Sequence, residues 1–177
     1  MLVVLTGKPG VGKSTVARRI ADELTHRGVP VAGIVTEEVR DGSRRRGFDV
    51  CDLATGECAT LADVDLPGPP RVGRYGVDLN RFEEIALAAL DPPEDGVLII
   101  DEVGPMELES EAFRERIAEL IEEPRDGVIT VPGRTHPLLE RIRVAGEQRF
   151  VTPDTRDELP TEVVELLARR LGYGTAA

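Results

Sequence analysis

The chain has 177 residues, of which 41% are hydrophobic and 31% charged, which is typical of a folded domain rather than a disordered chain. Lys and Arg number 22 against 33 Asp and Glu, so the formal net charge is -11 at pH 7. A negative surface repels phosphate backbones and anionic lipids, and no apolar run approaches the ~20 residues that span a bilayer. We therefore expect neither nucleic acid nor a membrane as a partner.

Short, almost wholly apolar runs predict strands buried on both faces of a parallel sheet. They cover residues 2–6, 31–36, 97–100 and 128–131, and a fifth strand is expected to end at 150–151.

The segments between these runs predict amphipathic helices. We expect one helix over 14–27, a second from the cap Asp78 as far as Pro92-Pro93, and a third after the cap Ser110. A last helix is expected near the C-terminus, where Thr152-Pro153 resembles a cap and first turn. Its apolar face would be formed by Val163, Leu166, Leu167 and Leu171. Alternating strands and helices indicate the α/β class, with a doubly wound, mostly parallel sheet.

One segment, residues 38–77, interrupts this alternation and is rich in Gly, Pro and Arg. Residues 48–61 predict a β-hairpin that turns at Ala54-Thr55-Gly56. We interpret the segment as an insertion near the carboxyl edge of the sheet, so that residues 1–177 form a single domain.

The two cysteines, Cys51 and Cys58, have no second pair or His cluster with which to build a zinc site. The first apolar run is too short for a signal peptide and follows no basic region, which predicts a cytoplasmic protein. The cysteines could lie near each other on the hairpin, but a structural disulfide is not expected in that compartment.

Residues 7–14 match the phosphate-binding pattern G-x-x-x-x-G-K-[ST] between the first predicted strand and the first predicted helix. Gly7, Gly10 and Gly12 allow several backbone N–H groups to point into one concavity. The Lys13 ammonium can bridge β- and γ-phosphate oxygens, and the Ser14 hydroxyl can ligate Mg²⁺. The sequence therefore predicts a P-loop NTPase domain whose partner is a nucleoside triphosphate and whose cofactor is Mg²⁺.

Two carboxylates follow the buried run 97–100. Asp101 is expected to hold Mg²⁺ directly or through water, and Glu102 to orient or deprotonate the attacking water. The alternative for Glu102 is an acid that only supports its neighbours or caps a helix. Residues 101–104 also fit D-x-x-G, but no N-K-x-D segment follows, which disfavours a dedicated GTPase.

A negatively charged transition state favours a further cation near the phosphates. The candidates are the run Arg44 to Arg46, Arg74 and Arg134, of which Arg46 and Arg134 are the catalytic hypotheses. The alternative is that these are solvated surface charges. Lys8 stands where some dimerising P-loop ATPases keep a lysine that reaches into the partner's site, but a solvent-facing lysine on a monomer is the preferred interpretation.

Five stretches carry a resemblance over most of the chain: GKPGVGKST, GFDVCDLATGE, VGRYGVDLNRFE, IIDEVGPMELESEAF and VTPDTRDELP. In these the sequence resembles the small nucleoside-triphosphatases of archaea and thermophilic bacteria, whose human relative is called cancer-related nucleoside-triphosphatase. The resemblance implies slow, Mg²⁺-dependent hydrolysis of nucleoside triphosphates to diphosphate and phosphate, with little preference for the base.

The resemblance also implies a nucleotide site formed by residues 7–15 and by the segment around 98–105. Its members would be Gly7, Lys8, Pro9, Gly10, Val11, Gly12, Lys13, Ser14, Thr15, Ile100, Asp101, Glu102, Val103 and Gly104. Two positions depart from the family pattern: Pro105 replaces an expected Lys, and Thr155-Arg156 replaces an expected Asn-Arg.

Two other functions suit the same loop. A nucleotide or nucleoside kinase would move the same phosphoryl group to a hydroxyl instead of water, and residues 38–77 could supply its lid. A nucleotide-dependent switch would use slow hydrolysis to time a partner interaction.

Overall fold

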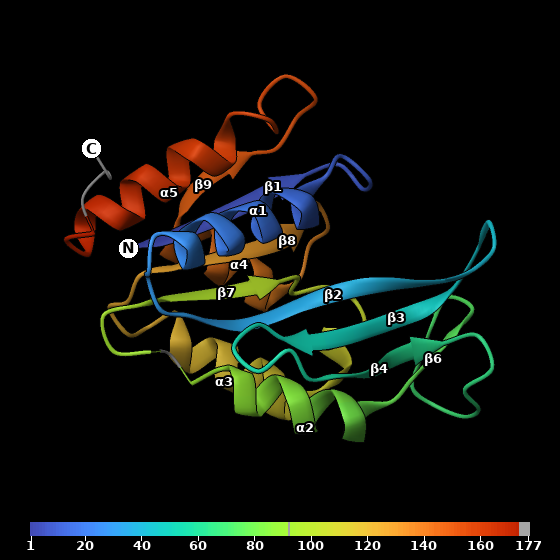
Figure 1. Ribbon diagram of the computed structural model, residues 1–177. Helices are drawn as coiled ribbons and strands as arrows, with labels where there is room; N and C mark the ends of the chain where they lie inside the picture. The colour runs from blue at the N-terminus through green and yellow to red at the C-terminus, as the bar shows by residue number, and fades with distance from the viewer. Residues whose placement is uncertain (92, 174–177) are drawn as a thin grey trace.

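The computed structural model describes residues 1–91 and 93–173 (Figure 1). The strands of the described residues are β1 Leu2–Gly7, β2 Val31–Asp41, β3 Arg44–Asp52, β4 Cys58–Asp63, β5 Arg71–Val72, β6 Tyr75–Val77, β7 Val97–Asp101, β8 Gly127–Pro132 and β9 Glu147–Phe150. The helices are α1 Lys13–His26, α2 Leu79–Ala89, the short 3₁₀ helix η1 Glu107–Glu109, α3 Glu111–Leu120, α4 Pro137–Ala145 and α5 Leu159–Arg170.

These strands form one sheet in the order β5-β6-β4-β3-β2-β7-β8-β1-β9. From β2 to β9 the neighbours are parallel. From β2 to β5 they are antiparallel, so the segment 38–77 continues the sheet beyond β2. Because the carboxyl ends of parallel strands meet at one edge, the loops after β1, β7 and β8 lie together there.

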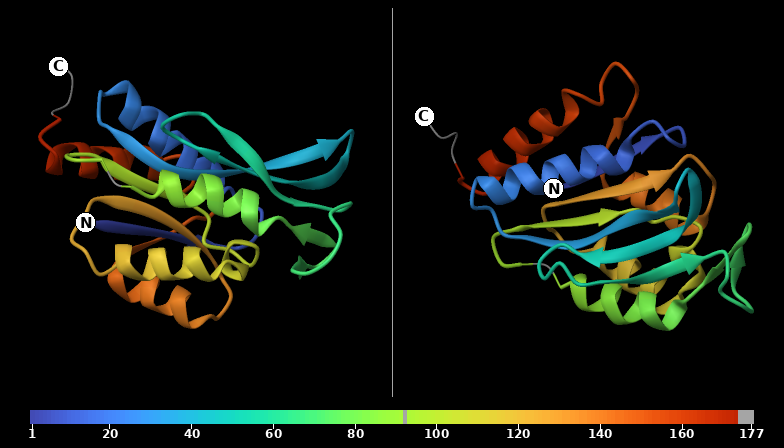
Figure 2. Two further views of the ribbon diagram at one scale, coloured as in Figure 1. Left: turned by 90° about the horizontal axis from the view of Figure 1, so that it is seen from below. Right: turned by 45° about the vertical axis from the view of Figure 1, so that its right-hand side comes forward.

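Helices cover both faces of the parallel strands (Figures 1 and 2). One apolar cluster joins α1 and α5 to the sheet through Val3, Leu5 and Ile99. The other joins α2, α3 and α4 through the intervening residues Val4, Leu98 and Ile100. Successive residues of these strands thus point to opposite faces of the sheet. Because helices cover both faces, both sets of side chains are buried, and the strands are apolar throughout. The α/β class is confirmed.

The helices differ from the expected ones in two places. Helix α4 was not predicted, although His136 caps it by accepting the Leu138 N–H at 3.2 Å and Pro137 opens it. Helix α5 begins at Leu159, not at Thr152. Thr152 and Thr155 bond each other's backbone N–H groups through their hydroxyls at 3.2 and 3.0 Å, which stabilises a turn instead of a helix start.

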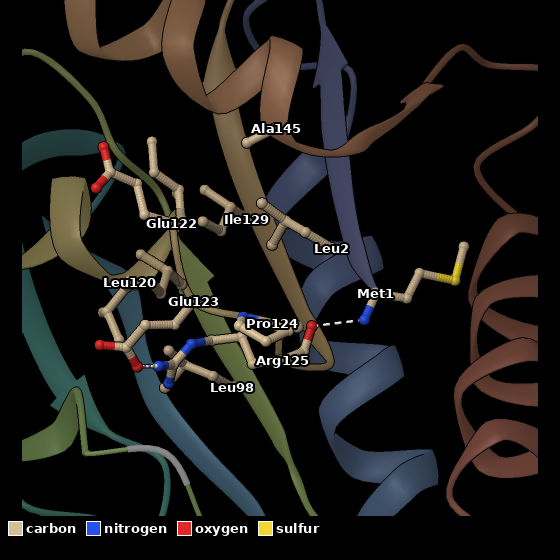
Figure 3. Close-up of a pocket in the computed structure, with 13 residues that line it drawn as sticks. Met1, Leu2, Leu98, Leu120, Glu122, Glu123, Pro124, Arg125, Ile129 and Ala145 are labelled. Atoms are coloured by element: carbon tan, nitrogen blue, oxygen red, sulfur yellow. Dashed lines mark hydrogen bonds and ion pairs between the residues drawn. The ribbon is translucent and has the colours of Figure 1, made fainter.

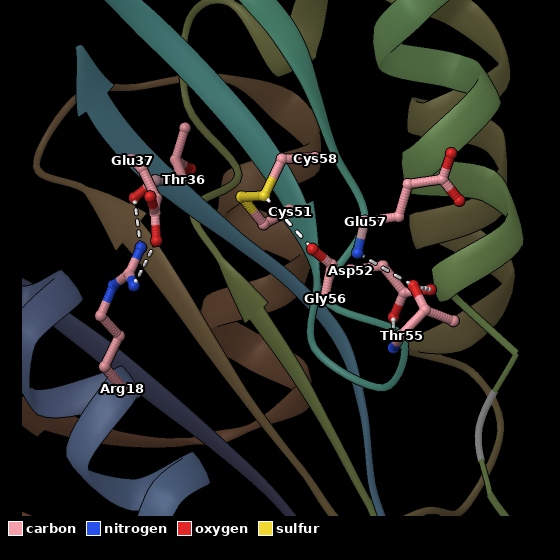
Figure 4. Close-up of a disulfide and its surroundings, with 9 residues drawn as sticks. All are labelled: Arg18, Thr36, Glu37, Cys51, Asp52, Thr55, Gly56, Glu57 and Cys58. Carbon is pink, nitrogen blue, oxygen red and sulfur yellow. Dashed lines mark hydrogen bonds and ion pairs between the residues drawn. A yellow bond between two sulfur atoms is a disulfide. The ribbon is translucent and has the colours of Figure 1, made fainter.

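The expectation about the cysteines was also wrong, because Cys51 and Cys58 form a disulfide (Figure 4). They lie directly opposite each other in the β3–β4 pairing, with a Cα–Cα distance of 4.1 Å. The expected cellular compartment does not indicate which residues of β3 and β4 lie opposite each other. Two cysteines that face each other across a strand pair are close enough to form a disulfide bond.

Within the described residues, helices are too short or too polar to cross a bilayer.

Candidate active site

The loop between β1 and α1 has the conformation that a phosphate cradle needs. Gly10 and Gly12 have φ of 74° and 107°, in the left-handed region that favours glycine. At Gly7 a Cβ would lie 2.6 Å from the carbonyl oxygen of Val151, so no larger residue fits. Because Gly12 precedes α1, no side chain caps the first turn, and its N–H groups are free to bind an anion.

Asp101 ends β7 at the centre of the sheet and is fully buried. The Thr130 hydroxyl donates to its Oδ1 at 2.7 Å, and the Thr36 hydroxyl donates to its carbonyl oxygen at 2.5 Å. Among the described residues, its Oδ2 has no hydrogen-bond partner. Burial raises the pKa of Asp101, and the Thr130 hydrogen bond, the nearby Ser14 hydroxyl and the charges of Arg18 and Lys13 oppose this effect.

The unpartnered oxygen of Asp101 fits a magnesium site. Ser14 and Asp101 supply a hydroxyl and a carboxylate, which are hard oxygen donors suited to Mg²⁺. Across residues 1–91 and 93–173, groups of three or more His, Cys, Asp or Glu side chains that could hold a metal do not occur. A cation here would complete its shell with water and substrate phosphates, which is the usual way Mg²⁺ is held in nucleotide sites.

Glu102 lies beside the phosphate loop. Its Oε2 is 3.6 Å from the Lys13 ammonium, and its side chain is 29% exposed while that of Lys13 is 9% exposed. Burial raises the pKa of Glu102, whereas the positive charge of Lys13 lowers it. The carboxylate therefore faces an accessible space and is a better proton acceptor than an ordinary surface glutamate.

Glu107 is a buried acid to which the sequence analysis gave no role. Its Oε2 accepts the Gly104 N–H at 3.1 Å, and the residue is 5% exposed. Burial raises the pKa of Glu107 to about 8. The available signal was its position between the apolar residues Met106 and Leu108, directly after the Asp101–Gly104 segment.

Two cavities flank this centre, and Glu102 and Pro105 line both. The hairpin-side cavity, about 530 Å³, is lined by Ser14, Arg18, Thr36, Glu37, Glu38, Phe48, Leu61, Val72, Glu102, Pro105, Met106 and Glu107. The Arg134-side cavity, about 740 Å³, is lined by Thr6, Gly7, Lys8, Pro9, Glu102, Pro105, Pro132, Gly133, Arg134 and Phe150.

The structure separates the two arginine hypotheses. Arg134 shares its cavity with the phosphate loop and Glu102. Arg46 lines a different cavity of about 410 Å³, together with Arg44, Arg45 and Arg74. Its guanidinium pairs with Asp63 at 3.1 Å and Asp65 at 2.5 Å, which raises the pKa of Arg46. Arg46 is therefore not brought to the phosphate loop.

The other residues expected in the nucleotide site differ in how exposed they are. Ile100 and Val103 are fully buried, so they support the site through the core. Lys8, Pro9 and Thr15 are exposed. The Arg156 side chain lies beside the loop, because a Cβ added at Gly12 would be 3.8 Å from Arg156 Cδ.

A further, apolar cavity of about 280 Å³ lies at the opposite edge of the sheet, where β1, β7 and β8 begin (Figure 3). Its lining includes Leu2, Leu98, Pro124 and Gly127, and it shares no residue with the phosphate loop.

Comparisons with known proteins show the family to which the chain belongs. A family model described as NTPase matches residues 2–164. Nucleoside-triphosphatase THEP1 of Pyrococcus abyssi is 39% identical over 97% of this chain and 95% of its own length. The human cancer-related nucleoside-triphosphatase is 41% identical over 92% of this chain and 94% of its own length.

Two solved structures are similar over 94% of this chain. The crystal structure of THEP1 from Aquifex aeolicus has a TM-score of 0.82 at 34% identity and is covered to 99%. The solution structure of the human cancer-related nucleoside triphosphatase has a TM-score of 0.77 at 38% identity and is covered to 97%. The resemblance seen in the sequence is thus confirmed, and the chain belongs to the NTPase family.

Proposed function

We propose that this chain is a P-loop nucleoside-triphosphatase that hydrolyses nucleoside 5′-triphosphates, with Mg²⁺ and little base preference, to diphosphate and phosphate. The observation that carries the proposal is the meeting of three groups at one edge of the sheet. They are the phosphate loop ending in Lys13, the buried Asp101 with its unpartnered oxygen, and the accessible Glu102.

Each group has a distinct task. The loop N–H groups and Lys13 bind the β- and γ-phosphates. Ser14 and Asp101 would hold Mg²⁺, which when bound neutralises phosphate charge. Glu102 orients a water and accepts its proton as the water oxygen bonds to the γ-phosphorus. The bond from that phosphorus to the β–γ bridging oxygen breaks, and its electron pair leaves with the diphosphate.

Arg134 is the cation that we assign to the developing charge. It lines the same cavity as Gly7, Lys8 and Glu102, and among the described residues no ion pair of its guanidinium is found. A guanidinium free of a carboxylate partner can stabilise the equatorial oxygens of the transferred group.

We propose further that the chain acts as a monomer and that the exposed Lys8 faces solvent.

The test is phosphate release from ATP, GTP, CTP and UTP, with Mg²⁺ and with excess chelator. We expect release from all four at similar rates, and only with the cation. Release from one nucleotide alone would contradict the broad specificity, and chelator-resistant release would contradict the cation's role.

A further inference from the structure

The hairpin-side cavity has the size of a small-molecule pocket, at about 530 Å³. One wall holds Ser14 and Glu102, the groups assigned to the triphosphate end. The reaction proposed above places only the triphosphate end and one water at Ser14 and Glu102, so it gives no role to the rest of the cavity.

Another part of the lining is apolar and comes from the segment that extends the sheet. It includes Phe48 of β3, Leu61 of β4 and Val72 of β5. Leu61 is 1% exposed, and the Phe48 ring packs edge-on against Tyr75 with centroids 5.4 Å apart. A fixed apolar wall favours a ligand with an apolar, preferably flat, body.

The cationic group of this cavity already has a carboxylate partner. Of the described residues that line it, Arg18 is the one cationic side chain. Its Nη1 lies 2.8 Å from Glu37 Oε1, and its Nη2 donates to the Thr36 carbonyl at 3.1 Å (Figure 4). Glu38 pairs with Arg40 and Arg45. An anionic ligand would meet carboxylates and no available cation, which costs binding free energy.

We propose that the hairpin-side cavity binds a second substrate, a small alcohol with an apolar body and no negative charge, which accepts the γ-phosphoryl group in place of water. This inference rests on the proposed function, because it needs the triphosphate end at Ser14 and Glu102.

The proposed phosphoryl transfer needs no reactant besides the nucleoside triphosphate and the alcohol. The hydroxyl oxygen of the alcohol bonds to the γ-phosphorus, and its proton passes to the Glu102 carboxylate. The bond between the γ-phosphorus and the β–γ bridging oxygen breaks, and the electron pair leaves with the nucleoside diphosphate. The products are a phosphate monoester and the diphosphate, and phosphate is released only when water attacks instead.

The test uses three alcohols with the same ring and different charges. The probes are 4-(aminomethyl)benzyl alcohol, which is cationic, 4-methylbenzyl alcohol, which is neutral, and 4-(hydroxymethyl)benzoate, which is anionic. Each is added at millimolar concentration to the enzyme with MgATP. Diphosphate, free phosphate and the phosphate monoester are then quantified.

We expect the cationic and neutral probes to yield monoester and to lower the phosphate released per diphosphate formed. The anionic probe should yield at least about tenfold less monoester, which corresponds to ~1.4 kcal/mol of discrimination. If the amounts of phosphate and diphosphate were equal with all three probes, no phosphoryl group would have passed to an alcohol. That result would overturn the second-substrate site. Equal transfer to all three would overturn its selection against negative charge.

A variant that fills the cavity tests its location. Val72→Trp places an indole at the rim, and Val144→Trp is the control because Val144 is 88% exposed on α4. The ratio of monoester to phosphate should fall about tenfold or more in the first variant and remain unchanged in the second. An unchanged ratio in Val72→Trp would place transfer elsewhere. Absence of any diphosphate from MgATP would instead refute the proposed function, so the two failures are distinguishable.

Discussion

The carboxylates of Glu102 and Glu107 approach the same backbone position from two sides. A Cβ on Gly104 would lie 3.0 Å from Glu102 Oε1 and 2.8 Å from Glu107 Oε2. Both atoms are the ends of flexible side chains, so a larger residue at Gly104 would push the two carboxylates aside, and glycine lets the Asp101–Gly104 turn and η1 keep the accessible acid beside the buried one.

Glu102→Gln should retain triphosphate binding and lose turnover by a factor on the order of 10²–10⁴, because an amide cannot accept the proton of the attacking water. Fluorescent-nucleotide titration and single-turnover hydrolysis separate the two effects. Glu109→Gln, an exposed acid in η1, is the matched control and should behave like the wild type. Full activity in Glu102→Gln would refute its assignment as the base.

Lys13→Ala should weaken triphosphate binding by roughly tenfold or more, because a charged hydrogen bond to phosphate contributes about 1.5–3 kcal/mol. The chain offers its own control, since Lys8 is the other lysine of the loop and is exposed. Lys8→Ala should bind normally in isothermal titration calorimetry. Equal losses in the two variants would show that only the net charge of the loop matters.

Arg134→Ala should lower turnover by at least about tenfold with little change in nucleotide affinity, because a transition-state arginine is worth on the order of 10³ in related chemistry. Arg46→Ala should turn over normally, since Arg46 is paired with Asp63 and Asp65 in a separate cavity. Steady-state kinetics of both variants measure these turnover rates. Slow turnover in Arg46→Ala and normal turnover in Arg134→Ala would instead identify Arg46 as the catalytic cation.

The pKa of Glu107, about 8 in the folded chain, predicts a pH-dependent stability. The unfolded carboxyl titrates near 4.5, so between pH 4.5 and about 8 the folded state binds more protons than the unfolded state. The free energy of unfolding therefore falls as pH rises through this window and levels off above it.

Glu107→Gln removes this titration and keeps an acceptor for the Gly104 N–H. Denaturant unfolding at pH 5 and about pH 9 should show the wild type losing on the order of 2–4 kcal/mol more than the variant. Parallel pH profiles for the two proteins would mean that Glu107 is not the group responsible.

Reduction of the Cys51–Cys58 disulfide should lower the free energy of unfolding by about 2 kcal/mol, because the bridge closes a short loop in the unfolded chain. Denaturant unfolding with and without reductant measures the difference. Cys58→Ser should unfold at one midpoint under both conditions. A wild type indifferent to reductant would show that the bridge adds no stability.

Local patterns were enough to predict several features. The predicted phosphate loop is contiguous, so its glycines, Lys13 and Ser14 could be proposed from spacing alone. Asp101 and Glu102 could be placed near it because the ends of parallel strands share an edge. Helix α4 was missed because nine residues with only three buried side chains, Leu138, Leu139 and Ile142, give a weak periodic signal.

The sequence by itself predicted the phosphate loop and the acidic strand end and determined the α/β class and the family, because each depends on patterns that are read along the chain. Only the tertiary structure decided that Arg134 and not Arg46 lies beside the loop, that Cys51 faces Cys58, and that Glu107 is buried behind Glu102. These relationships depend on strand register and on packing between distant segments, which composition and periodicity do not encode.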